Sequence, residues 1–177
     1  TVKGDLHDIG KNLVGMMWRG ANIDVIEPPD LPDVYAFIRS IQRDGAIRCL
    51  AADNIGYYAK DEPSLRAVRE QRAEFWQGCQ AGMHVIGVTS DGGVKGCLSM
   101  PDDLLEGNIR ETPLREIWTR GDAFAYNRQF NANSLTGDCQ GCPFGKLCRA
   151  GCHSFTMSAL GKLTENPYCM RIVGPSS

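Results

Sequence analysis

Seven cysteines in the second half of the chain have the spacing expected of thiolate ligands to a metal centre. Cys79 and Cys97 flank Gly92, and the remaining five follow the pattern Cys-x2-Cys-x5-Cys-x3-Cys with one more near the C-terminus: Cys139, Cys142, Cys148, Cys152 and Cys169. Thiolates two or three residues apart can converge on one inorganic centre, and distant segments can supply its other ligands. Seven sulfurs exceed the needs of one tetrahedral site and nearly complete two.

Two other interpretations of the cysteines stay open. Eight cysteines in 177 residues are less dense than in a small disulfide-stabilised domain, which disfavours a disulfide framework. A non-catalytic zinc-binding module is a stronger alternative, because four thiolates suffice for structural zinc. Zinc ribbons usually pair two Cys-x2-Cys motifs, however, and this chain has one, Cys139 to Cys142. The x5 and x3 gaps that follow favour a larger iron–sulfur cluster.

The order of the seven cysteines, with Gly92 at a fixed distance before Cys97, resembles the SPASM domain. This domain is the C-terminal extension of radical SAM enzymes that modify peptides and proteins. The sequence around the cysteines is similar too, at residues 90–99, 107–110, 114–118 and 166–169. The resemblance implies two auxiliary four-iron four-sulfur clusters. It assigns Cys79, Cys97 and Cys152 to the first cluster, and Cys139, Cys142, Cys148 and Cys169 to the second.

The first of these two sets lacks a fourth cysteine. Family members often supply one just upstream of the position of Cys79, where this chain has none. The only other cysteine, Cys49, lies in an alternating apolar stretch, where a lone cysteine is usually a small core side chain. We therefore expect an open iron in the first cluster, which could bind substrate, a small ligand or a side chain other than cysteine.

The region around the cysteines predicts a small, loop-rich α+β domain. Apolar residues 83–88 and 94–99 flank Ser90-Asp91-Gly92-Gly93, which predicts a β-hairpin. Thr112 and Pro113 predict the cap and first residue of a helix that ends at Trp118. Residues 139–152 contain three glycines and no apolar periodicity, so we expect a bound cluster to order this segment.

The same resemblance implies that residues 30–74 form the end of a radical SAM partial barrel and a linker helix. Val34, Phe37, Ile38 and Ile41 share one face of a predicted helix over 34–44. An apolar strand is predicted over 46–51, and a second helix over 63–76 leads into the SPASM domain, residues 75–177. Helix and strand together would form one α/β unit.

Residues 1–29 resemble a truncated piece of a different family, the cobalamin-binding domain of corrinoid methyltransferases. The similarity rests on the motif formed by Asp5, His7 and Gly10 and on the sequence around it. In that family the histidine ligates cobalt and the aspartate orients the imidazole. The similarity ends near Glu27, before the motifs that accept the nucleotide tail. We therefore expect no cobalamin binding and consider a corrinoid-carrier fragment only as an alternative function.

The chain contains no Cys-x3-Cys-x2-Cys motif, which would hold the cluster that cleaves S-adenosylmethionine. We expect S-adenosylmethionine to bind only in the missing part of the barrel, so that this chain is a fragment or a fusion and is inactive alone. The net charge is −2 with both signs interspersed, which argues against a nucleic-acid partner, and no segment resembles a membrane span.

The resemblance thus predicts an iron–sulfur domain of a radical SAM peptide or protein maturase. We expect a cytoplasmic location, because thiols stay available to iron in a reducing compartment. Its expected role is electron transfer or substrate docking. The expected partners are a peptide or protein substrate and an electron donor or acceptor protein.

Overall fold

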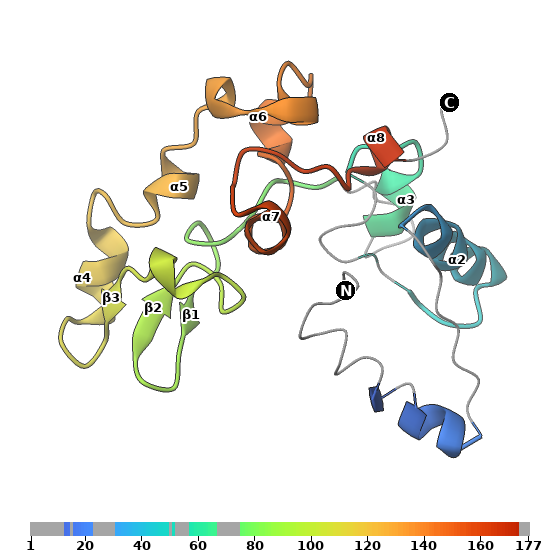
Figure 1. Cartoon of the computed structure of the whole chain (residues 1–177), viewed down its shortest axis with the longest axis horizontal. Coiled ribbons are helices and arrows are strands. Elements are labelled where there is room, and N and C mark those ends of the chain that lie inside the picture. The colour runs from blue at the N-terminus through green and yellow to red at the C-terminus, as the bar shows by residue number, and fades with distance from the viewer. Residues whose placement is uncertain are drawn as a thin grey trace.

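The computed structural model describes residues 13–14, 16–22, 31–49, 51, 57–66 and 75–173. It contains helices and one small antiparallel sheet, joined by long loops (Figure 1), which confirms the predicted α+β class. The elements of the cysteine-rich part, in chain order, are β1 (Gly87–Val88), β2 (Gly93–Lys95), η1 (Asp102–Leu104), β3 (Gly107–Asn108), α4 (Leu114–Thr119), α5 (Ala125–Arg128), η2 (Ala132–Ser134), η3 (Gly137–Cys139), α6 (Gly145–Cys148), α7 (His153–Leu160) and α8 (Met170–Val173).

The predicted hairpin forms the first half of the sheet. Strands β1 and β2 pair antiparallel with Val88 opposite Val94, and β3 pairs antiparallel with the other edge of β2. The turn requires a glycine at position 92, because its φ is +94° and a Cβ there would lie 2.5 Å from Oδ1 of Asn108. Cys97 follows β2 by two residues, so the hairpin fixes where this cysteine enters the domain.

One hydrophobic core lies between this sheet and the short helices that follow it. Its fully buried members are Val94, Ile117, Ala123 and Phe124, with Ile86, Trp118 and Tyr126 packed around them. Helix α4 supplies Ile117 to this core, although it begins one residue later than predicted. Pro113, not Thr112, occupies the cap position, with an extended ψ of 136° and no side-chain hydrogen bond to the helix. The predicted Thr112 cap is therefore wrong.

A second core forms around two aromatic residues that precede the cysteine-rich region. Tyr57, Trp76 and Cys152 are its buried members, and Tyr58, Cys148, Phe155 and Cys169 pack against them. The rings of Tyr57 and Trp76 meet edge to face, with centroids 5.3 Å apart. This core therefore consists largely of the residues around the cysteines, and a ligand held there would bear directly on folding.

Glu62 connects the segments that carry these aromatic residues. Its carboxylate is fully buried and accepts hydrogen bonds from the backbone N–H of Trp76 at 2.9 Å and from Arg66 at 2.7 Å. It also accepts one from the backbone N–H of Tyr58. A buried carboxylate is tolerable when it is paired in this way. Glu62 begins helix α3 (Glu62–Arg66) and thereby holds Tyr58 and Trp76 in place.

The upstream α/β unit is only partly as predicted. Helix α2 (Leu31–Asp44) is present and packs against α3 and α8 (Figure 1). The predicted strand over 46–51 is wrong at its described residues 46–49 and 51, which form a bend and irregular chain. The backbone there bonds elsewhere: the carbonyl of Cys49 accepts from Gln42 at 2.9 Å, and the N–H of Ala51 donates to Leu65 at 3.1 Å. The second helix was predicted over 63–76: residues 63–66 are helical, 67–74 lie outside the described residues, and 75–76 are not helical.

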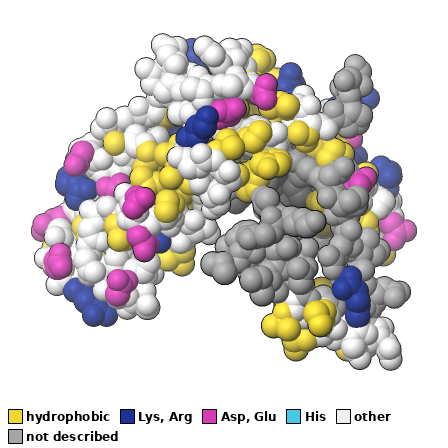
Figure 2. Space-filling model, viewed as in Figure 1, with side chains coloured by type: hydrophobic (Ala, Val, Ile, Leu, Met, Phe, Trp, Pro, Cys, Tyr) yellow, Lys and Arg dark blue, Asp and Glu magenta, His cyan; other side chains and the backbone are white. Residues whose placement is uncertain are grey.

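Near the N-terminus, residues 13–14 and 16–20 are helical and their side chains are exposed, among them Met16, Met17 and Trp18. These apolar side chains form the yellow group at the lower edge of Figure 2. The predicted cobalamin motif, Asp5, His7 and Gly10, lies outside the described residues. No helix among the described residues has the length and apolar content needed to cross a membrane.

Candidate metal centre

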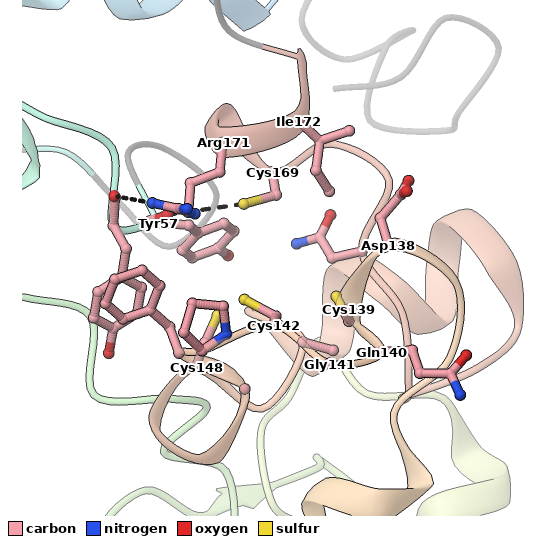
Figure 3. Close-up of a pocket in the computed structure, with 16 residues that line it drawn as sticks. Tyr57, Asp138, Cys139, Gln140, Gly141, Cys142, Cys148, Cys169, Arg171 and Ile172 are labelled. Carbon is pink, nitrogen blue, oxygen red and sulfur yellow. Dashed lines mark hydrogen bonds between the residues drawn. The ribbon is translucent and has the colours of Figure 1, made fainter. Parts of the chain in front are cut away.

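Four of the seven cysteines line a single cavity of about 270 Å³, although they come from a segment of 31 residues with α7 between its ends. They are the set that the resemblance assigns to the second cluster: Cys139, Cys142, Cys148 and Cys169. In Figure 3, Cys169 lies across the cavity from Cys142 and Cys148. The cavity therefore presents thiols from opposite sides to a ligand in its centre.

Short turns position three of these four cysteines. Cys139 ends η3, and its carbonyl accepts the N–H of Cys142 at 3.2 Å. The N–H of Gly145 then donates to the carbonyl of Cys142 at 2.9 Å and begins α6, which ends at Cys148. Each turn closes within three residues, so the backbone wraps around the cavity without a core of its own. Such a segment depends on its ligand for order.

Aromatic rings and one arginine form the rest of the cavity wall. The ring of Tyr58 stacks on Phe144 with centroids 4.4 Å apart, and the guanidinium of Arg171 lies 4.8 Å from the centroid of Phe144. Arg171 also donates to the carbonyl of Tyr58 at 3.4 Å, and the thiol of Cys169 lies 3.8 Å from the carbonyl of Tyr57 (Figure 3). This wall places aromatic rings and a positive charge beside the thiols.

Burial disfavours the thiolate form of these cysteines while no cation is near. Desolvation is the largest cause that raises the pKa of Cys148 to about 12 and that of Cys169 to about 11, with neighbouring thiols adding to both shifts. Burial raises the pKa of Cys139 as well. Bound metal ions would reverse this preference, since a coordinating thiol loses its proton outright. These four thiols are therefore better suited to bind a cationic centre as thiolates than to surround a cavity without a cation.

The three cysteines of the first set do not line this cavity, and one of them, Cys152, belongs to the second core. Burial raises the pKa of Cys79, and the charges of Cys152 and Cys97 raise it further, so both of these thiols are within electrostatic reach of Cys79. The backbone N–H groups of Ala81 and His153 face the Cys79 sulfur and lower its pKa in part. Such N–H groups would stabilise a thiolate bound to iron.

Asn127 fixes the backbone of this first set. It is fully buried, and its side-chain amide donates to the carbonyls of Cys79 at 2.7 Å and Ala81 at 2.8 Å. The backbone carbonyl oxygen and the side-chain Oδ1 of Asn127 both accept hydrogen bonds from Arg149, and the bond to Oδ1 is 3.0 Å long. Asn127 thus connects the segment before the sheet with the turn that precedes Cys152.

The turn between Cys148 and Cys152 separates the two sets. Arg149, Ala150 and Gly151 all have positive φ, at 55°, 61° and 82°. The left-handed conformation costs about 1–2 kcal/mol for a residue with a Cβ. It sharply redirects the chain, so Cys148 lines the cavity with Cys139, whereas Cys152 lies near Cys79.

The spacing of the thiols bears on which metal centre they could hold. Among the described residues, no three Cys, His, Asp or Glu side chains converge closely enough to bind one metal ion. A single zinc ion needs four ligands at about 2.0–2.3 Å, whereas a cluster of several irons separates its thiolates more widely. Four cysteines around a cavity therefore fit a cluster better than a zinc ion. None of the eight cysteines forms a disulfide.

The structure also shows which residues near the metal centre the sequence alone does not indicate. Cys49 belongs to neither set: it is half-buried beside α2, with its carbonyl bonded to Gln42. Tyr57, Asn127 and His153 are fully buried next to the cysteines and were not predicted as part of the site. His153 in particular is the first residue of α7 and has no exposed surface.

This constellation of a hairpin, short turns and two groups of cysteines defines an iron–sulfur cluster-binding domain. Comparison with known families agrees, because residues 79–143 match the model of SPASM, described as an iron-sulfur cluster-binding domain. The chain therefore carries a SPASM domain.

Similar proteins share one name. A protein from Methanosarcina barkeri, named AdoMet-dependent heme synthase, is 32% identical over 160 residues, which is 86% of this chain and 44% of that protein. A protein of the same name from Nitratidesulfovibrio vulgaris is 33% identical over 95 residues, covering 52% of this chain and 24% of that protein. The chain thus spans less than half the length of these curated relatives.

Proposed function

We propose that this chain binds two four-iron four-sulfur clusters and is the auxiliary-cluster part of an AdoMet-dependent radical enzyme. The observation that carries the proposal is the cavity lined by Cys139, Cys142, Cys148 and Cys169. Four thiols on different sides of one cavity are the ligand set that a cubane cluster requires. Cys79, Cys97 and Cys152 would hold the other cluster.

The side chains around the cavity would bind and shield the cluster. A bound cluster supplies one-electron transfer, at a potential set by charge, hydrogen bonds and exposure. Tyr58 and Phe144 cover the second site with stacked rings, and Arg171 adds a positive charge at its edge. Both the burial and the cation would tune the electron affinity of that site. The same surroundings favour a role in electron transfer over direct contact with a bulky substrate at this cavity.

The substrate of the complete enzyme is proposed from its relatives. Because the similar proteins are named AdoMet-dependent heme synthases, we propose that the complete enzyme acts on a tetrapyrrole. The resemblance to maturases supports a second candidate, a peptide or protein substrate. Both substrate classes should therefore be tested. For either substrate the enzyme needs an electron donor or acceptor protein and a reducing cytoplasm, since eight cysteines remain without disulfides.

The cluster proposal is tested by anaerobic reconstitution with iron and sulfide, followed by metal analysis and visible spectroscopy. We expect about eight irons per chain and a broad absorption that bleaches on reduction. Stoichiometric zinc that resists chelation, with no uptake of iron afterwards, would contradict the proposal and support the zinc-binding module.

The substrate proposal is tested on the complete enzyme. Titration with a carboxylate-bearing porphyrin should shift the porphyrin absorption band when it binds, and titration with small peptides encoded by neighbouring genes should give no comparable signal. Binding of a neighbouring peptide, with no response to the porphyrin, would favour the maturase. The cluster proposal does not depend on this outcome.

A further inference from the structure

The three cysteines of the first set leave one ligand position unassigned, and a histidine lies directly beside them. His153 follows Cys152 in the chain and begins α7. Its side chain is fully buried, and its backbone N–H faces the sulfur of Cys79. His153 is therefore adjacent to one cysteine of the set in sequence and to another in space.

The hydrogen bond of this histidine determines which ring nitrogen carries the proton. Nε2 lies 2.9 Å from the backbone carbonyl oxygen of Arg149. A carbonyl oxygen can only accept, so Nε2 must donate its hydrogen. In the neutral ring with Nε2 protonated, Nδ1 carries an available lone pair.

Nδ1 has no hydrogen-bond partner within the described part of the chain, although it is completely buried. Buried polar atoms are nearly always satisfied, and an exception calls for a ligand or another explanation. A histidine that donates from one nitrogen to a backbone carbonyl and keeps the other unpaired has the arrangement typical of metal-ligating histidines.

We infer that Nδ1 of His153 is the fourth ligand of the first iron–sulfur cluster, completing the set of Cys79, Cys97 and Cys152. The inference rests on the proposed function, because it requires a cluster at the first site. It replaces the open iron expected from the sequence with an iron that has a nitrogen ligand. The Arg149 carbonyl would hold the imidazole in the required tautomer.

A neighbouring tyrosine provides the matched control. Tyr126 packs with its ring centroid 6.0 Å from that of His153, and its hydroxyl is also buried without a partner in the described structure. A phenol keeps its proton at neutral pH, so the hydroxyl of Tyr126 is suited to donate a hydrogen bond rather than to ligate iron. Removal of this hydroxyl should leave the iron coordination unchanged.

The direct test is pulsed electron paramagnetic resonance of the reduced, reconstituted chain. A ligating histidine nitrogen should give a strong hyperfine coupling to one cluster, which changes when histidine is labelled with ¹⁵N. The coupling should persist in Tyr126→Phe and in His84→Gln, whose histidine is exposed and bonded to Gln80 at 2.6 Å. It should vanish in His153→Ala and in His153→Cys.

The two His153 variants then distinguish a lost ligand from a lost fold. We expect His153→Cys to keep about eight irons per chain with a four-thiolate first cluster, and to lower its reduction potential, because a thiolate adds negative charge. His153→Ala should make the first cluster labile and lose up to half of the iron on mild chelation. If both clusters are present in the unaltered chain but neither shows nitrogen coupling, the inference fails and the proposed function stands. If no iron binds to the first cysteine set at all, both fail.

Discussion

The hydroxyl oxygen of Tyr57 accepts a hydrogen bond from the backbone N–H of Cys152 at 3.0 Å. The two residues are 95 positions apart in the sequence. The backbone carbonyl of the same tyrosine lies 3.8 Å from the thiol of Cys169. Tyr57 therefore contacts one cysteine of each set, and its ring packs edge to face against Trp76.

We predict that Tyr57→Phe destabilises the chain and loosens the first site. The substitution keeps the ring but leaves the buried N–H of Cys152 without this acceptor, which costs about 1–3 kcal/mol. The measurement is denaturant unfolding of the reconstituted chain, with the rate of iron release to a chelator as a second readout. Tyr168→Phe, on a residue that is 39% exposed, serves as the control and should change neither. Equal stability of the two variants would contradict the prediction.

Replacing Cys142 or Cys148 by Ala should remove one cluster and disorder the segment from 139 to 152. The segment closes through short turns and has little apolar content with which to fold unaided. Iron should fall from about eight to about four per chain, and limited proteolysis should cut within this segment. Retention of all iron in both variants would show that these thiols are not ligands.

Cys49→Ala should leave the iron content intact, in contrast to Cys142→Ala. Cys49 is half-buried beside α2, outside both cysteine sets, and its contact with Gln42 uses the backbone carbonyl, which Ala retains. We expect a loss of stability on the order of 1 kcal/mol, as for other small packing changes. Iron per chain and thermal unfolding check this. A loss of iron as large as that of Cys142→Ala would make Cys49 a ligand.

The iron-free, reduced chain should lose stability as pH rises above about 9. Burial raises the pKa of Cys148 to about 12 and that of Cys169 to about 11, from an ordinary value of 9.0. The folded chain therefore binds these protons more tightly than the unfolded chain, and their contribution is full below pH 9 and is lost between pH 9 and 12.

This pH dependence can be measured by urea unfolding at several pH values. The variant Cys148→Ser, which does not titrate in this range, should show a shallower decline. The iron-loaded chain should also show a shallower decline, because iron has already displaced the thiol protons. Parallel curves for all three forms would refute the prediction.

No stable cobalamin complex should form with this chain. The motif of Asp5, His7 and Gly10 is followed by no counterpart of the segments that accept the nucleotide tail. Gel filtration with cobalamin should therefore give no co-elution, and His7→Ala should behave like the unaltered chain. Co-elution with a spectrum that changes in His7→Ala would reverse this conclusion.

The local parts of the site follow from the sequence, and the long-range parts do not. The turn at Gly92 and the closely spaced cysteines depend on neighbours a few residues away, so spacing and residue type predict them. Tyr57 reaches Cys152 across 95 positions, and no periodic pattern marks such a contact. His153 was likewise missed, because its burial and its bond to Arg149 depend on how α7 packs.

The error at residues 46–51 has a related cause. Alternation of apolar residues describes a surface that is half-buried, but a strand also needs a neighbouring backbone with which to pair. The backbone of Cys49 instead bonds to the side chain of Gln42, and that of Ala51 to Leu65 of α3. Ile47 is accordingly 70% exposed.

The left-handed turn at Arg149, Ala150 and Gly151 has a consequence for how iron is loaded. Its two ends, Cys148 and Cys152, belong to different proposed sites, so a cluster bound at either end would restrict the same three residues. Fixing this turn costs conformational entropy of about 1–2 kcal/mol per residue, and this cost reduces the binding free energy of whichever cluster binds first. The second cluster then binds to a backbone that is already ordered, so the two sites should fill with positive cooperativity. Chains with one cluster should be rare during reconstitution, and chains with none or two should dominate.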